Sequence, residues 1–107
     1  QEVSGRYVSW DRAKFDRHFG MWTALAENFG VGVMCGEMGC YKECPHDVMI
    51  AWYKDMMECL KERNMGYAIW SFTGTFGIID SGRTDIELED YNGHKLDREL
   101  LTLLQQY

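Results

Sequence analysis

The chain has 107 residues, of which 46% are hydrophobic, and 11 Lys and Arg stand against 17 Asp and Glu for a net charge of −6. This length fits one small domain at most, and the apolar fraction is too high for an intrinsically disordered chain. The acidic balance argues against nucleic acid or a membrane surface as a partner. No apolar run approaches the ~20 residues that a membrane-spanning helix needs.

The first expected element is a helix over residues 10–29. Apolar side chains recur there at steps of three and four residues, which places them on one helix face. They are Phe15, Phe19, Trp22, Ala26 and Phe29. Asp11 is a candidate N-cap, and Gly30 is a candidate C-terminal stop.

Two short apolar runs are expected to form buried strands. Residues 31–36 (VGVMCG) and 67–72 (YAIWSF) do not alternate with polar residues, as is typical of parallel strands covered on both faces. A second helix is expected between them, from near Pro45 to about Asn64. Its apolar stripe comprises Val48, Trp52, Met56 and Leu60, widened by Met49, Tyr53 and Met57.

The last expected elements are a long loop over residues 73–94 and a helix that contains Leu96, Leu100, Leu103 and Leu104. The predicted fold class is therefore α/β, in the order α-β-α-β-α, with two adjacent parallel strands. Two such strands cannot cover their own faces and edges, and a loop of this length is unusual in a compact domain. The sequence thus predicts a piece of a larger α/β fold.

Two residues near the strand ends are candidates for chemistry. Glu37 is the first charged residue after the first strand run, and Trp70 lies near the end of the second. Ligands of parallel α/β sheets bind at the carboxyl ends of the strands. A carboxylate beside an indole ring suits a sugar, because the aromatic face packs on pyranose C–H groups. From the residues alone, Glu37 could equally be a solvated carboxylate and Trp70 a core residue.

Several motifs, in this order and with these gaps, resemble glycoside hydrolase family 5, the cellulase family of (β/α)8 TIM barrels. They are GVMCGEMGCY, PHDV-x3-WY, GYAIWSF, FGIIDSGR-x-D and GHKLDRELL. The resemblance runs from about Trp10 to Gln106. It implies that residues 1–107 are the C-terminal fragment of a barrel domain, and that the two strands are barrel strands seven and eight.

The resemblance also implies roles for residues of this chain. The glutamate that closes the seventh strand of the family is the catalytic nucleophile, and Glu37 in Gly36-Glu37-Met38-Gly39 matches it. The tryptophan near the end of the eighth strand lines the sugar site, and Trp70 in Trp70-Ser71-Phe72 matches that residue. The implied reaction is hydrolysis of a β-linked polysaccharide or oligosaccharide, most simply a β-1,4-glucan, with retention at the anomeric carbon and without a metal or organic cofactor.

The family's acid/base residue is missing from this chain. It is a glutamate in an N-E-P motif after the fourth strand, and no such motif occurs here. We therefore expect the isolated chain to be inactive and to need the remainder of a barrel. The alternative is a non-catalytic fragment that acts as a carbohydrate-binding module or associates with itself through its uncovered strand edges. The localisation is left open: the chain has no signal-peptide pattern, and secretion would fit the parent enzyme.

Other polar and aromatic residues have two interpretations each. Tyr41 could reach the cleft as a substrate-binding residue or be a surface turn aromatic, and His46 is expected at the surface or as a helix cap. Asp80, Arg83 and Asp85 could shape a subsite or be solvated loop charges. The four cysteines, at positions 35, 40, 44 and 59, include no C-x2-C pair; they fit free thiols or a disulfide better than a zinc site.

Overall fold

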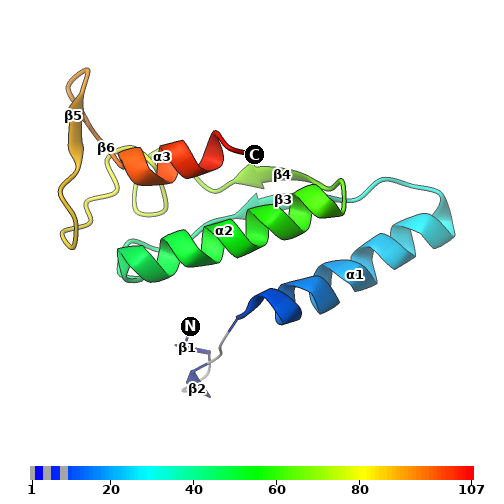
Figure 1. Ribbon diagram of the computed structural model, residues 1–107. Helices are drawn as coiled ribbons and strands as arrows, with labels where there is room; N and C mark the ends of the chain where they lie inside the picture. Colours follow the sequence, from blue (N-terminus) through cyan, green and yellow to red (C-terminus); the bar gives the residue numbers. More distant parts are fainter. Residues whose placement is uncertain (1, 4–5, 8–9) are drawn as a thin grey trace.

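The computed structural model describes residues 2–3, 6–7 and 10–107 of the chain. Figure 1 shows the arrangement of its helices and strands. In chain order the elements are β1 (Glu2–Val3), β2 (Arg6–Tyr7), α1 (Arg12–Phe29), β3 (Met34–Met38), α2 (His46–Glu62), β4 (Gly66–Ile69), β5 (Glu89–Tyr91), β6 (His94–Leu96) and α3 (Arg98–Leu104).

Strands β3 and β4 form a parallel pair, as the sequence predicts, with Met34 opposite Gly66 and Met38 opposite Ile69. From α1 to β4 the order α-β-α-β is confirmed, and α3 follows near the C-terminus. The antiparallel pairs β1–β2 and β5–β6 are additions that the predicted order lacks. In Figure 1, α2 lies along the β3–β4 pair, and α1 runs along the other side of α2.

Helix α1 has the caps that its sequence predicts, but only part of its apolar face is buried. The Asp11 side chain accepts a hydrogen bond from the Lys14 N–H, and Gly30 ends the helix with a φ of 66°. Phe19 is buried, whereas Trp22 and Phe29 are 45% and 71% exposed. Helix α2 covers only part of the apolar face that the sequence predicts, so Trp22 and Phe29 remain exposed.

Helix α2 is the central element of the core. Its most deeply buried residues include Tyr53, Met57 and Leu60, while Val48 is 53% exposed. The buried face of α2 is therefore rotated from the predicted stripe toward Tyr53 and Met57, which were predicted only to widen it. The displacement has a physical reason: α1 and α3 both contact α2, so its buried surface follows their position as well as that of the strands.

Strand β3 begins three residues later than expected and includes Glu37. Residues 31–33 are apolar but have no strand partner, since β4 pairs only with residues 34–38. Met34 is 60% exposed, and of the five residues of β3 only Met38 is buried. The apolar composition of this segment predicts a strand covered on both faces, but one side of β3 is open to solvent.

The expected structureless loop contains a hairpin. Strands β5 and β6 pair antiparallel and are joined by Asn92 and Gly93, both with positive φ. An Asn-Gly pair is the residue combination that a tight two-residue hairpin turn favours. The loop before it is tied to β6 by the Asp80 N–H, which donates to the Lys95 carbonyl oxygen at 2.8 Å. The loop expectation for residues 73–94 is therefore wrong in its second half.

The molecule is flat and extended rather than compact. Its principal extents are 48 × 34 × 18 Å, and its radius of gyration is 15.2 Å. A compact chain of this length would have a radius of gyration of about 13 Å. The excess agrees with the exposed side of β3 and the exposed part of α1.

Candidate active site

The backbone of the parallel pair brings Glu37 and Trp70 to one edge. Glu37 is the penultimate residue of β3, and Trp70 directly follows β4. The Trp70 N–H donates a hydrogen bond to the Met38 carbonyl oxygen at 2.7 Å, and Trp70 is joined to Ser71 by a cis peptide bond. Because the strands are parallel, both residues lie at their carboxyl ends, where α/β folds bind ligands.

An irregularity in β3 determines how Glu37 is presented. Cys35 pairs with Tyr67 and Met38 with Ile69, so three steps along β3 match two along β4. One extra residue in one strand is a β-bulge, a feature that often lies beside active sites and redirects a side chain. Cys35 and Met38 can thus both face the core, while Glu37 between them is exposed.

Gly39 allows a close approach of the two strand ends. A Cβ atom at this position would lie 1.9 Å from the Trp70 carbonyl oxygen and 3.6 Å from Cδ1 of Phe76. No side chain fits at the first of these distances. The glycine that follows Glu37 and Met38 is therefore required for Trp70 to sit against the end of β3.

Three aromatic residues lie around this edge. Trp70 is 55% exposed and Tyr41 45% exposed, so neither is a core residue. The rings of Tyr41 and Phe76 are 5.4 Å apart between centroids. Their loops are joined because the Lys42 N–H donates to the Thr75 carbonyl oxygen at 2.8 Å. The sequence analysis did not identify Phe76 as a site residue. Its position in the loop that begins with Trp70 could have indicated that it lies near the ends of the strands.

Arg83 is a buried residue that links two loops, not a solvated loop charge. Its side chain is 2% exposed. One guanidinium nitrogen lies 2.8 and 2.9 Å from the Asp85 carboxylate oxygens, and the other donates to the Cys44 carbonyl oxygen at 3.1 Å. Arg83 thereby joins the loop after β4 to the loop after β3, and its interpretation as a solvated loop charge is wrong.

His46 is also buried, so its expected surface position is wrong. It is the first residue of α2, and its N–H donates to the Asp85 carboxylate at 2.8 Å, which caps the helix from a distant loop. Its Nε2 lies 2.9 Å from the Asp97 carboxylate, which in turn accepts from the Leu100 N–H and caps α3. Burial tends to raise the pKa of Asp85, but the His46 N–H and the Arg83 charge outweigh it and lower that pKa.

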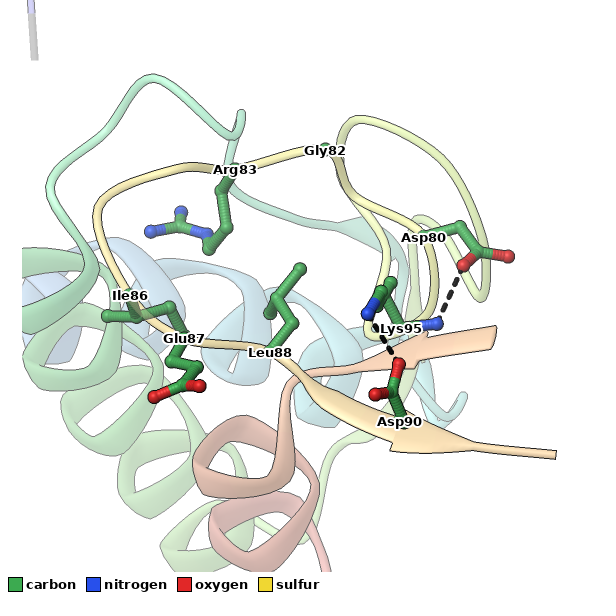
Figure 2. Close-up of a pocket in the computed structure, with 8 residues that line it drawn as sticks. All are labelled: Asp80, Gly82, Arg83, Ile86, Glu87, Leu88, Asp90 and Lys95. Carbon is green, nitrogen blue, oxygen red and sulfur yellow. Dashed lines mark hydrogen bonds and ion pairs between the residues drawn. The ribbon is translucent and has the colours of Figure 1, made fainter. Parts of the chain in front are cut away.

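The loop and hairpin enclose a shallow pocket that is separate from this edge. It has a volume of about 530 Å³ and is lined by Asp80, Gly82, Arg83, Ile86, Glu87, Leu88, Asp90 and Lys95 (Figure 2). The Lys95 ammonium bonds to Asp90, and the Lys95 N–H donates to Asp80 at 2.8 Å. Both carboxylates are engaged by Lys95 of the hairpin, and neither Glu37 nor Trp70 lines the pocket.

The described part of the chain offers no obvious metal centre. In residues 2–3, 6–7 and 10–107, no three His, Cys, Asp or Glu side chains are grouped so that they could hold a metal ion. None of the helices described is long and apolar enough to cross a membrane.

Comparison with solved structures shows where this arrangement occurs. A crystal structure of a glycoside hydrolase is 37% identical in sequence, with a TM-score of 0.81, and the match covers 99% of this chain and 32% of that one. The structures most similar to this chain thus include glycoside hydrolases, among them an endoglucanase. The chain therefore has a mixed α/β fold found in this class of enzymes, and it spans about a third of the length of the structures that it matches.

Two further neighbours extend the comparison. The cellulose synthase subunit Z (CcsZ) of Clostridioides difficile is 25% identical, with a TM-score of 0.71, over 91% of this chain and 31% of that one. Cel5A of Thermotoga maritima in complex with mannotriose is 20% identical, with a TM-score of 0.72, and the match covers 94% of this chain and 30% of Cel5A. The second likeness shows the fold alone. No protein-family profile matches the chain, and no curated protein sequence does.

Proposed function

We propose that this chain is the C-terminal part of a (β/α)8-barrel glycoside hydrolase of family 5, and that it carries the nucleophile half of a retaining active site. The observation that carries the proposal is the pairing of β3 with β4, which puts Glu37 and Trp70 at the carboxyl ends of adjacent parallel strands. The 37% identity to a glycoside hydrolase over almost the whole chain supports it. Strands β3 and β4 would be the seventh and eighth of the barrel.

Glu37 has the chemistry for the first step of retention. Its carboxylate oxygen would attack the anomeric carbon and form a glycosyl ester, while a carboxylic acid protonates the departing glycosidic oxygen. Water activated by that second group would then hydrolyse the ester. The two carboxyl groups must lie about 5–5.5 Å apart in a retaining enzyme. The second group has to come from outside residues 1–107, because the chain has no N-E-P motif.

The exposed rings of Trp70 and Tyr41 would bind the sugar. An aromatic face packs against the C–H groups of a pyranose, and both rings are accessible. Solved neighbours include an endo-β-1,4-glucanase in complex with substrate and Thermotoga maritima Cel5A with cellobiose and with mannotriose. We therefore propose a β-linked polysaccharide or oligosaccharide as substrate, with β-1,4-glucan the first to test.

Complementation tests the proposal. The chain is joined to a barrel segment that supplies the preceding strands and an acid/base glutamate; this product is called the completed enzyme. It should release reducing ends from a soluble β-1,4-glucan, while the 107-residue chain alone should not. A 2-deoxy-2-fluoroglycosyl fluoride should form an ester at Glu37, which peptide mass mapping locates. A label on another carboxylate would refute the nucleophile assignment.

The exposed apolar face of α1 favours one alternative, a non-catalytic fragment that associates with itself. This face comprises Met21, Trp22, Leu25 and Phe29. In the main proposal, the remainder of the barrel covers it. In the alternative, a second copy covers it, and the completed enzyme would be inactive although the chain forms a stable oligomer. Activity that depends on Glu37 separates the two.

A further inference from the structure

The loop that carries Tyr41, residues 39–45, has no helix or strand of its own and is held against the loop after β4. We call it the Tyr41 loop. Its Lys42 N–H donates to the Thr75 carbonyl oxygen at 2.8 Å, and the rings of Tyr41 and Phe76 are 5.4 Å apart between centroids. The place where the Tyr41 ring meets solvent therefore depends on contacts with a second loop.

The side chain of Arg83 makes a further attachment to the Tyr41 loop. Its Nη2 donates to the Cys44 carbonyl oxygen at 3.1 Å, and its Nη1 lies 2.8 and 2.9 Å from the two carboxylate oxygens of Asp85. Asp85 also accepts from the N–H of His46, the first residue of α2, at 2.8 Å. The buried guanidinium is thus fixed between a carboxylate that is bonded to α2 and the main chain of the Tyr41 loop.

Cys44 connects Arg83 to Tyr41 through its main chain. Its carbonyl oxygen accepts from Arg83, and its N–H donates to the Tyr41 carbonyl oxygen at 2.9 Å. The planar fork of arginine suits this place, because one nitrogen can pair with a carboxylate while the other donates to a carbonyl oxygen. A lysine has a single ammonium group and cannot reproduce this arrangement. Two hydrogen bonds therefore link a buried charge to the main chain of an exposed aromatic residue.

From this path we infer that Arg83 is a positioning residue for the substrate, which holds the Tyr41 ring where it packs on a sugar unit. The inference rests on the function proposed above, in which Tyr41 binds the glycan. Because the Arg83 side chain is 2% exposed, it acts through Cys44 rather than on the glycan itself. A ring that binds sugar equally in the ground and transition states affects affinity and leaves kcat nearly unaltered. Displacement of the Tyr41 ring should therefore weaken glycan binding without slowing bond cleavage.

Hydrogen exchange of the full chain tests the positioning by itself. Arg83→Lys keeps the positive charge but removes the fork, so exchange of the Lys42 amide should accelerate at least about 10-fold relative to the Met65 amide in the core. Arg98→Lys is the matched control, because Arg98 also makes a two-nitrogen pair with a carboxylate, that of Glu89, but joins α3 to β5. It should leave the exchange ratio unchanged. An unchanged ratio in Arg83→Lys as well would overturn the inference.

A double-mutant cycle in the completed enzyme tests the link to the substrate. Isothermal titration calorimetry gives the Kd of a β-1,4-linked oligosaccharide, and initial rates give kcat. Arg83→Lys should raise Kd at least about 3-fold, with kcat within about 2-fold of the parent. In the Tyr41→Ala background the same change should alter Kd by less than about 2-fold, because no ring is left to be displaced. General damage to the fold would persist in that background.

Asp85→Asn is a second variant that retains the arginine. It removes the charge that orients the Arg83 guanidinium, so it should also raise Kd, and again only when Tyr41 is present. A loss of affinity that persists with Tyr41→Ala, or a fall in kcat at unchanged Kd, would overturn the inference.

The outcome is separable from the nucleophile assignment. An ester at Glu37 without coupling between Arg83 and Tyr41 would overturn the positioning role alone. Coupling with the ester on another carboxylate would support the positioning role and refute the role of Glu37. A completed enzyme that binds no oligosaccharide would overturn both.

Discussion

The main-chain N–H of Trp70 donates a hydrogen bond to the carbonyl oxygen of Met38 at 2.7 Å. This bond continues the parallel pairing of β3 and β4 by one residue and places Trp70 beside the residue that follows Glu37. The two groups that we propose to act on a sugar are therefore held in relation by the backbone. We therefore expect the framework to remain when either side chain is replaced.

Gly39→Ala should disrupt this relationship. The added methyl group would meet the Trp70 carbonyl oxygen, so the end of β3 or the start of the following loop must shift. We expect a loss of about 1–3 kcal/mol in the free energy of unfolding of the completed enzyme. Gly36→Ala is the matched control, since nothing lies within 4 Å of its added Cβ, and it should change stability by less than about 0.5 kcal/mol. Equal denaturation midpoints for the two variants would contradict the prediction.

Glu37→Gln should remove the nucleophilic charge and retain the shape of the side chain. In the completed enzyme we expect kcat to fall at least about 10⁴-fold, with oligosaccharide affinity within a few-fold of the parent. Glu43→Gln makes the same change at a glutamate in the loop after β3 and should leave kcat unaltered. Initial rates and isothermal titration calorimetry measure the two quantities. Near-normal turnover by Glu37→Gln would refute the proposed role.

Replacement of the aromatic residues should weaken binding and turnover together. Trp70→Ala removes an exposed ring that can stack on a pyranose in both the ground and transition states, so kcat/KM should fall about 10- to 100-fold. Phe76→Ala should have a smaller effect, through loss of the ring that supports Tyr41. Tyr91→Ala, an exposed aromatic on β5, is the control. The idea fails if Trp70→Ala and Tyr91→Ala behave alike.

Acid should weaken the contact between the hairpin and the preceding loop. The Asp80 carboxylate accepts from the Lys95 N–H and lies 2.7 Å from His94 Nδ1, and these contacts lower its pKa from the ordinary value of 3.8. Because the pKa of Asp80 is lower in the folded chain, its ionised carboxylate stabilises the fold fully above about pH 3.8. This stabilisation is lost as the pH falls through the pKa that Asp80 has in the folded chain. Hydrogen exchange of the Lys95 amide should therefore accelerate below this pH relative to the Met65 amide.

Asp80→Asn provides the control for this pH dependence. The variant lacks the titrating group, so its Lys95 amide should exchange at one relative rate across the same acid range. A wild-type Lys95 amide that stays protected as strongly as the Met65 amide would show that Asp80 does not hold the hairpin.

The isolated chain should associate through the exposed face of α1. Burial of large apolar side chains such as Trp22 and Phe29 drives self-association when nothing else covers them. The double variant Trp22→Glu, Phe29→Glu should raise the dissociation constant of the oligomer at least 10-fold in sedimentation equilibrium. Ala24→Glu introduces one glutamate at another exposed position of α1 and should have less effect than either Trp22→Glu or Phe29→Glu alone. A monomeric wild-type chain with a cooperative melt would rule the prediction out.

The elements that the sequence predicted correctly are those encoded locally. The apolar spacing of α1 and its caps at Asp11 and Gly30 lie within one segment, so the pattern alone indicates the helix. The two apolar runs on either side of α2 predicted a parallel pair. The helix between them carries the chain back to the starting end of the first strand, so the second strand runs in the same direction. The position of Glu37 and Trp70 at the strand ends could be predicted for the same reason, since each lies near the end of its own run.

The tertiary structure decided the features that depend on residues far apart in the chain. His46 is buried because Asp85 caps its helix and Asp97 bonds its ring, and none of these contacts has a local signature. The register of β3 follows from its pairing with β4, which inserts a bulge before Met38 and so exposes Glu37. The sequence by itself thus determined which groups reach the strand ends, whereas long-range packing and hydrogen bonding decided how they are presented there.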